Sequence, residues 1–348
     1  MCGQAALSGR LRLIDKLLSF TLDLNRLDAA TKAKVIKIIN AAQKELISDL
    51  ASKNLTAFGK ARRDALLKDA RNIIESYYAQ AQMELFDTLE PIPELTAKQT
   101  VKALQSKLPA SIQAALPTEN VFKSLASDSL VLGATSTEWW KKQSADTVFR
   151  YNSAVRQGLT LGESNNQIIS RVRQVLDVSR RNAAGLVQTS VSTVANASRQ
   201  ATFDANSDII KGTKWISALD SRVCELCLAR ADKEWDNTGK PIGHGIPFSV
   251  PPIHYNDRCI LTAVTKTFRE LGVDIDEPPI TTRASVDGQV SAKTTIDDFL
   301  KRKGEAWQNE TLGKGRADLW REGKISLENL IDGSGQPLTV AQLRAKYG

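Results

Sequence analysis

The stretch "AAGLVQTSVSTVANASRQATFDAN", residues 183–206, has the pattern of a long and tightly packed helix. Its apolar and small residues recur at spacings of three and four, which places them on one helical face. Small side chains on such a face let a neighbouring helix approach closely. We expect Ser179 to cap the start of this helix. The expected packing face consists of Ala184, Val187, Val191, Val194, Ser198, Ala201 and Ala205.

Further helices precede this stretch. Ser136 or Thr137 can cap a helix that ends near Gly158, and a second helix is expected to begin near Ser164. The first 90 residues predict two long amphipathic helices, and Pro91 and Pro93 then break the pattern. The apolar positions of these two helices are Val35, Ile39, Ala42, Leu46 and Leu50, and then Leu66, Ala70, Ile73, Tyr77 and Ala81.

The residue pattern alternates with a period of two from Trp215 and once more after Cys259. This alternation predicts two short strands, one on either side of a Gly/Pro-rich loop. The fold class that follows is mainly α, with a small α+β Cys/His module and a short helical tail. The expected organisation is a helical N-terminal region at 1–90, a linker with short helices at 91–135, a helical middle domain at 136–270 whose module spans 215–264, and a linker with a helical tail at 271–348.

The 348 residues carry a net charge of +8. No apolar run is long enough to span a membrane, and the N-terminus lacks a signal peptide pattern, so we expect a cytosol-like compartment and no membrane partner. The excess charge is concentrated at 138–214, where 11 Lys and Arg face 6 Asp and Glu. We predict that this segment contacts phosphates, unless its charges form an ordinary solvated face. The candidate DNA-binding residues are Arg171, Arg173, Arg180 and Arg181.

Three of the four cysteines and both histidines lie within residues 224–259. Cys224 and Cys227 form a CxxC pair, and His254 and Cys259 follow at a distance that can complete a tetrahedron around one ion. Sulfur and nitrogen donors suit zinc better than magnesium or calcium. We therefore predict a structural Zn²⁺ site made by Cys224, Cys227, His254 and Cys259, with His244 as the second choice of imidazole.

Other interpretations of the same residues stay open. The CxxC pair could be redox-active, although it lacks a βαβ context, and the cysteines could form a disulfide or act as small buried apolar residues. His254 could be an ordinary loop histidine. The sequence contains no zinc-hydrolase or deaminase motif, no P-loop and no nucleophile elbow. We therefore expect no catalytic residues and no enzymatic activity.

The module resembles the C-terminal motif of the phage Mu F-like minor head proteins, also called phage head morphogenesis proteins. In that family a W-x-x-x-x-D strand leads into C-x-x-C, then a short turn, and then P-P-x-H-x-N-C-R-C. The helices from Ser136 onward and the C-terminal tail also resemble the family, whereas 1–135 is similar only in being helical. The matching residues are Trp215, Asp220, Cys224, Cys227, Ala231–Trp235, Pro251, Pro252, His254, Asn256, Arg258 and Cys259.

Two positions depart from the family pattern. Asp257 stands where the first cysteine of C-R-C is expected, which removes one potential thiolate. Ser190 stands where the family has a glutamate in its long helix. If that glutamate orients a basic partner in relatives, this chain has lost or moved the contact.

The resemblance implies a minor capsid protein of a tailed phage that acts in head assembly and in binding or delivery of packaged double-stranded DNA. The implied location is inside the virion head near the portal vertex, after assembly in the host cytoplasm. The implied partners are the portal protein, packaged DNA through its phosphates, and further copies of the chain or a major capsid or scaffolding protein. We assign portal binding or self-association to the N-terminal helices.

A second hypothesis is a zinc-dependent nuclease that acts on DNA. His254, Asn256 and Asp257 in "HYND" would then lie near a metal ion. Nuclease sites of this kind normally need a second histidine on a helix, which the sequence does not offer. Cleavage of plasmid DNA that depends on His254 would favour this hypothesis.

Overall fold

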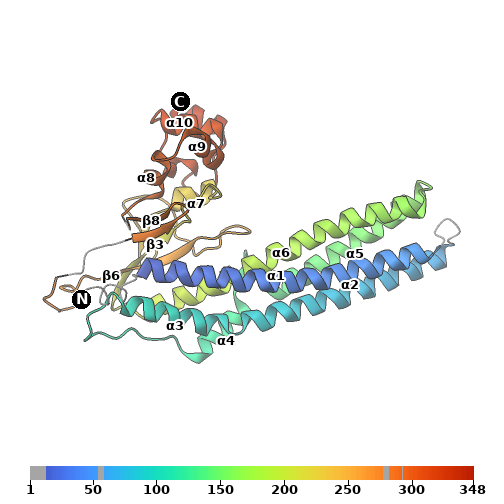
Figure 1. Ribbon diagram of the computed structural model, residues 1–348, viewed down its shortest axis with the longest axis horizontal. Helices are drawn as coiled ribbons and strands as arrows, with labels where there is room; N and C mark the ends of the chain where they lie inside the picture. Colours follow the sequence, from blue (N-terminus) through green and yellow to red (C-terminus); the bar gives the residue numbers. More distant parts are fainter. Residues whose placement is uncertain (1–12, 54–58, 277–281, 292) are drawn as a thin grey trace, which may run out of the picture.

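The computed structural model describes residues 13–53, 59–276, 282–291 and 293–348, so Cys2, to which the sequence assigns no role, lies outside the described residues. The described chain is mainly α, as the sequence predicts, with a four-stranded sheet in its C-terminal half. Figure 1 shows long helices lying side by side in an elongated bundle, and a smaller body of strands and short helices at one end of it. Among the described helices, none has both the length and the apolar character of a bilayer span.

Helix α6 lies at the centre of the bundle and packs against each of the other three long helices. Of the predicted face, Val187, Val191, Val194 and Ser198 are buried, whereas Ala184 and Ala201 are only partly buried and Ala205 is exposed. Leu186, Thr189, Ser190 and Ala195, outside that face, are buried as well. The reason is that helices surround α6 instead of covering one side. The four long helices are α1 (Leu13–Ser52), α2 (Lys60–Leu89), α5 (Ser136–Thr160) and α6 (Asn165–Asp204).

The prediction that Ser179 caps a separate helix is wrong, because α6 runs without a break from Asn165 to Asp204. The start lies at Ser164, where the side chains of Ser164 and Gln167 form a capping box. The Ser179 hydroxyl instead shares a hydrogen bond with Thr147 on α5 at 2.9 Å and donates to the Val175 carbonyl. A serine inside a helix can satisfy its hydroxyl in this way without ending the helix.

The apolar stripes of α1 and α2 are buried within the bundle. Every predicted apolar position of α1 is at most 4% exposed. On α2 the prediction is wrong at two positions. Ile74 and Tyr78 are buried there in place of the predicted Ile73 and Tyr77, which are only partly buried. A run of spacings of four keeps Leu66, Ala70, Ile74 and Tyr78 in line, since α2 packs against both α1 and α5.

The chain between α2 and α5 contains α3 (Ile92–Gln105), α4 (Glu119–Asp128) and a two-stranded ribbon of β1 (Leu130–Val131) and β2 (Ala134–Thr135). Pro91 and Pro93 stand in the turn and first helical positions that begin α3, where proline is tolerated. Helix α3 packs on α6, and the Ser198 hydroxyl donates to the Pro93 carbonyl at 2.6 Å. This segment therefore extends the bundle at the end that adjoins the module.

The module is built on an antiparallel sheet with strand order β5-β4-β3-β6. Trp215 on β3 and Trp235 on β4 are fully buried. Gly212 is required on β3 because a Cβ there would lie 2.2 Å from the Trp235 carbonyl oxygen. The strands are β3 (Ile210–Ile216), β4 (Glu234–Asp236), β5 (Pro241–Ile242) and β6 (Ile260–Thr265), and the helix α7 (Glu225–Arg230) lies between β3 and β4.

The C-terminal tail folds onto the module and shares its apolar core, in which Leu219 and Leu228 cluster with Phe299 and Leu330. The strands β7 (Thr282–Ser285) and β8 (Gly288–Ser291) form a hairpin before it. The tail consists of α8 (Ile296–Lys301), α9 (Glu305–Leu312), α10 (Lys314–Arg321), the 3₁₀ helix η2 (Leu327–Leu330) and α11 (Val340–Tyr347).

Candidate metal centre

Helix α7 presents the CxxC pair. Cys224 is the N-cap of α7 and Cys227 lies on its first turn, so the two sulfurs are on the same side of the helix. Cys224 is partly buried and Cys227 is 2% exposed. The three described cysteines are free thiols, and no disulfide joins them.

His254 comes from the loop between β5 and β6 and points into the same place. Its Nε2 atom lies 3.1 Å from Cys224 Sγ and 3.2 Å from Cys227 Sγ. Its Nδ1 atom lies 2.9 Å from the Tyr255 carbonyl oxygen and donates to it, which leaves Nε2 as the atom that faces the sulfurs. A hydrogen bond of this kind to the outer nitrogen is typical of histidines that bind metal ions.

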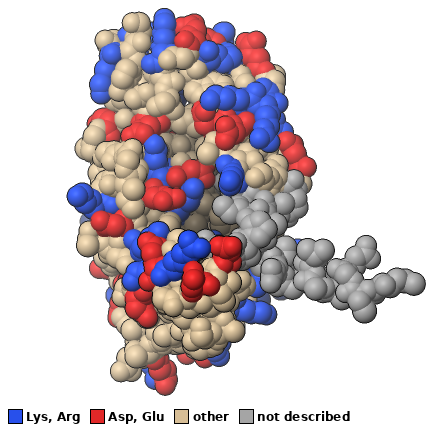
Figure 2. All heavy atoms as spheres, turned by 90° about the vertical axis from the view of Figure 1, so that its left-hand side faces the viewer, with Lys and Arg blue, Asp and Glu red and all other residues tan. Residues whose placement is uncertain are grey.

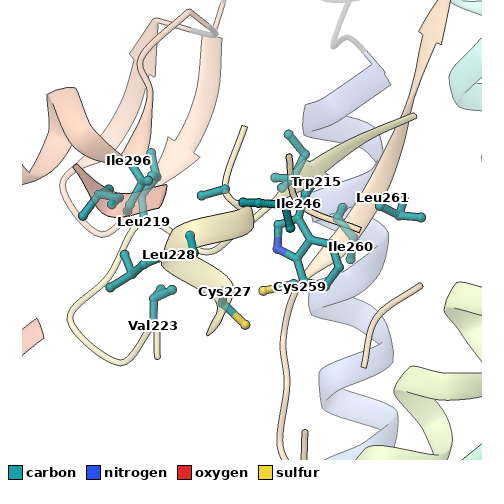
Figure 3. Packing of buried hydrophobic residues seen from close by; sticks show 14 of the residues in the cluster. Trp215, Leu219, Val223, Cys227, Leu228, Ile246, Cys259, Ile260, Leu261 and Ile296 are labelled. Carbon is teal, nitrogen blue, oxygen red and sulfur yellow. The ribbon is translucent and has the colours of Figure 1, made fainter. Parts of the chain in front are cut away.

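Cys259 and Asp257 complete the cluster from the chain that leads into β6. Cys227, Asp257 and Cys259 are all buried, and their donor atoms lie within 4.8 Å of one another. Figure 3 shows Cys227 on α7 and Cys259 beside β6 with their sulfurs close together, next to the indole of Trp215. Cys224, Cys227, His254, Asp257 and Cys259 therefore lie close enough to bind a metal ion.

The Asp257 carboxylate has three hydrogen-bond partners within the cluster. It accepts from the Cys259 N–H at 2.9 Å and the Ile253 N–H at 3.0 Å. It also accepts from Cys227 Sγ at 3.5 Å. The aspartate that replaces the family's cysteine therefore organises the loop that presents His254 and Cys259. Sequence reasoning treated it as a lost ligand, because its hydrogen bonds to the backbone depend on the folded loop.

The three thiols lie so close together that a negative charge on one sulfur disfavours ionisation of the others. A hydrogen bond from Cys227, with a further contribution from His254, lowers the pKa of Cys224 to about 5, while hydrogen bonds with Cys224 and Cys259 raise the pKa of Cys227. A hydrogen bond to Cys224 raises the pKa of His254 to about 9, and burial raises the pKa of Cys259. Crowded sulfurs cannot all ionise without a cation. The donor set of sulfur and imidazole nitrogen fits a borderline-soft divalent ion.

Second-layer contacts fix the cluster to the sheet and to the bundle. Arg258 forms a two-point ion pair with Asp220, with N···O distances of 2.5 and 2.9 Å, and this arginine lowers the pKa of the Asp220 carboxyl. From α6, Asn196 donates to the Cys259 carbonyl at 3.3 Å. The Ser217 hydroxyl on the other side lies 3.6 Å from Cys259 Sγ.

His244 lies outside the cluster. Its Nε2 atom donates to the Glu234 carbonyl at 2.8 Å and its Nδ1 atom accepts the Ile246 N–H at 3.1 Å. Its ring packs edge-on against Trp235. Since the chain has two histidines, His254 is the single imidazole of the cluster. A helix-borne second histidine, as a nuclease site would need, is not supplied.

The four candidate DNA-binding arginines do not form one surface. At about 100° per residue, Arg173 and Arg180 share a side of α6, while Arg171 projects from the opposite side. Arg171 is held by Glu163, with its Nε 2.7 Å from Oε2. Arg173 and Arg181 are exposed, and Arg180 lies 3.4 Å from Asp177. The end of the molecule seen in Figure 2 shows basic and acidic side chains interspersed.

Comparison with known proteins gives one family. Residues 150–262 match the model of the family described as "Phage Mu protein F like protein". No curated protein and no solved structure matches the chain. The matched segment contains the C-terminal part of α5, all of α6, and the module up to β6, including every residue of the cluster. Over this segment the chain is therefore similar to the phage Mu protein F-like family, as its motif predicts.

Proposed function

We propose that this protein is a structural minor capsid protein of a tailed phage, located at the portal vertex inside the head, where it acts in head assembly and in binding or delivery of packaged DNA. Similarity to the phage Mu protein F-like family implies phage head morphogenesis. The match over residues 150–262 is the observation that carries the proposal. Immunogold labelling of virions with an antibody against this protein is the direct test, and label at one vertex is the expected result.

The metal in this proposal is a structural Zn²⁺ held by Cys224, Cys227, His254 and Cys259. Three thiolates and an imidazole from two separate segments would be joined by one ion, and such a site is closed to substrates. Zinc would supply charge neutralisation to the sulfurs and fix α7 against the chain that enters β6. Metal analysis after purification under reducing conditions tests this, with about one zinc per chain expected. Absence of zinc, with the cysteines still reduced, would contradict it.

The DNA contact in this proposal uses Arg173, Arg180 and Arg181, with Arg171 contributing less because Glu163 already binds its guanidinium. Contacts to phosphates are independent of sequence and weaken steeply with salt. We expect charge reversal of Arg173, Arg180 and Arg181 to abolish retention of a DNA duplex at about 50 mM salt. Arg171→Gln is the matched control and should keep most of the retention. Unchanged retention in the triple variant would contradict the assignment.

Binding to the portal or self-association would use surfaces of α1 and α2 that the bundle leaves open. Their apolar stripes are buried, so partners must contact outward-facing residues. Leu27 on α1 and Met83 and Phe86 on α2 are apolar and 37%, 66% and 47% exposed. We expect Met83→Glu together with Phe86→Glu to weaken co-purification with the portal protein. An unchanged yield of the complex would contradict this role.

We propose further that the protein is not an enzyme. The cluster offers one histidine, and the Asp257 carboxylate is engaged by structural contacts, since it accepts from the Cys259 and Ile253 N–H groups. Incubation of plasmid DNA with the protein and Mg²⁺ or Zn²⁺ should leave it intact. Cleavage that is lost in His254→Ala would establish the nuclease alternative.

A further inference from the structure

Arg199 on α6 is buried in the interior and is 1% exposed. Its Nη1 atom donates to Asn196 Oδ1 at 2.5 Å. Its Nε and Nη2 atoms are buried and have no hydrogen-bond partner among the residues that the structure describes. Guanidinium groups in protein interiors are normally paired, because an unpaired buried charge is strongly destabilising.

No carboxylate of the described chain compensates Arg199. It takes part in none of the ion pairs found within residues 13–53, 59–276, 282–291 and 293–348. Burial lowers the pKa of Arg199 to about 10, whereas a nearby carboxylate would act in the opposite direction. The positive charge at this point of α6 therefore has no ion-pair partner among the described residues.

A small cavity adjoins Arg199 between α1, α6 and the chain that enters β6. It has a volume of about 20 Å³. One water molecule needs about 10–15 Å³ on this scale, so the cavity holds one or two small particles and excludes a phosphate or an organic acid. Its lining includes Thr21 and Asn25 from α1 and Gln188, Ser192 and Asn196 from α6.

Each of the other charged residues around the cavity has at least one partner of its own. Asp257 accepts hydrogen bonds within the metal cluster, and Arg258 is bound to Asp220. Asp28 lies 3.3 Å from Lys32 through Oδ2, while its Oδ1 atom is buried without a hydrogen-bond partner among the described residues. Burial raises the pKa of this carboxyl, which favours the neutral form, and a protonated Oδ1 would donate a hydrogen bond to an anion. Arg199 is therefore the cationic group of the cavity that lacks an ion-pair partner among the described residues.

We propose that the cavity binds a monoatomic anion of the halide class, chloride in the cell, against Nε and Nη2 of Arg199. The anion neutralises the guanidinium and holds α1 to α6 beside the metal centre. Asp257 and Cys259 of the metal cluster also line the cavity, but the tests below measure the anion itself and require neither bound DNA nor bound zinc.

The first experiment is a crystal of the full chain grown with bromide in place of chloride, measured at the bromine absorption edge. The expected result is an anomalous peak within hydrogen-bond distance of Arg199 Nη2. Density for water without an anomalous signal would overturn the proposal, as would a backbone carbonyl that occupies the same place.

The second experiment compares folding stability in chloride with stability in gluconate at the same ionic strength. Binding to the folded state alone makes the folding equilibrium constant rise about tenfold for each tenfold rise in chloride above the dissociation constant. Arg199→Met should abolish this dependence, and Arg173→Met, an exposed arginine on the same helix, should keep it. A dependence that persists in Arg199→Met would overturn the proposal. If Arg199→Met does not fold, the bromide measurement on the natural chain decides.

Discussion

The helical bundle and the Cys/His module are stabilised in different ways. The bundle has helices of 25 to 40 residues, and their long contacts bury a continuous aliphatic cluster. The module has strands of two to seven residues and one helix of six residues. Long helices bury apolar area along their whole length, whereas the short elements of the module depend on the core that they share with the tail and on cross-links. The donor cluster lies between a six-residue helix and the loop that leads into β6, where regular structure is sparse.

The two regions are nevertheless connected at the donor cluster. Asn196 and Ser192 on α6 bond the carbonyls of Cys259 and Asp257. The tail in turn packs on the module through Lys233 and Glu328, which form an ion pair. If zinc holds the cluster, the metal positions the tail relative to the bundle.

Loss of the metal ligands should have the largest effect and should be confined to the module. We expect Cys224→Ser with Cys227→Ser to remove the zinc and to expose the module and tail to proteases, since a structural zinc contributes on the order of 10 kcal/mol to small domains. Limited proteolysis with metal analysis and circular dichroism is the measurement. The bundle should keep its helical signal. Cys2→Ser is the control, and complete unfolding of both regions would show that they are one cooperative unit.

A cavity in the bundle should have the next largest effect and the opposite pattern. Leu186 on α6 is fully buried in the bundle core. We expect Leu186→Ala to lower the free energy of unfolding by about 2–5 kcal/mol and to leave the zinc content unchanged. Denaturant titration measures the loss. Phe149→Ala, at a side chain that is 73% exposed, should change stability by less than about 0.5 kcal/mol. Equal effects of the two variants would contradict the assigned core.

Breaking the row of buried, hydrogen-bonded hydroxyls in the bundle should lower stability by a smaller amount. Thr147 bridges Tyr78 and Ser179, with both O···O distances at 2.9 Å. Thr147→Val keeps the shape and leaves two buried hydroxyls without this partner, so we expect a loss of about 1–3 kcal/mol. Thermal unfolding monitored by circular dichroism is the measurement. Thr160→Val, at an exposed position near the end of α5, is the control. A loss no larger than that of the control would show that the buried hydroxyl hydrogen bonds contribute nothing to stability.

The Asp220–Arg258 ion pair should give the smallest effect, about 1 kcal/mol, because both side chains are partly exposed. Arg258 lowers the pKa of Asp220 from its usual value of 3.8, so the folded state binds the proton less readily than the unfolded state. This contribution is therefore fully present above about pH 5 and is lost as the pH falls below 3.8 through the folded-state pKa.

The measurement for this pair is the free energy of unfolding of the natural chain and of Asp220→Asn across this pH range. The difference between them should be constant near neutral pH and should shrink in acid. A difference that does not change with pH would show that the ion pair adds nothing to folding. Asp23→Asn, at an exposed position on α1, provides the control.

The sequence by itself determined the helical class and the position of the module. The period of the hydrophobic pattern is a local property. The buried stripe of residues 35–50 and the start of α6 at Ser164 were therefore predicted correctly. The spacing of Cys224, Cys227, His254 and Cys259 also marked the cluster, since ligand spacing along the chain is visible without a fold. The family resemblance rested on the same residues and was confirmed by the match.

Only the tertiary structure decided which residues are enclosed and which are free. Ser179 satisfies its hydroxyl across to α5, and α6 therefore continues where a cap was expected. Arg171 is bound by Glu163, and Arg199 is buried, although both count equally in the charge of the sequence. Asp257 became part of the cluster through hydrogen bonds to its own loop. Burial and pairing of a charge depend on neighbours that are distant along the chain, and no local pattern contains them.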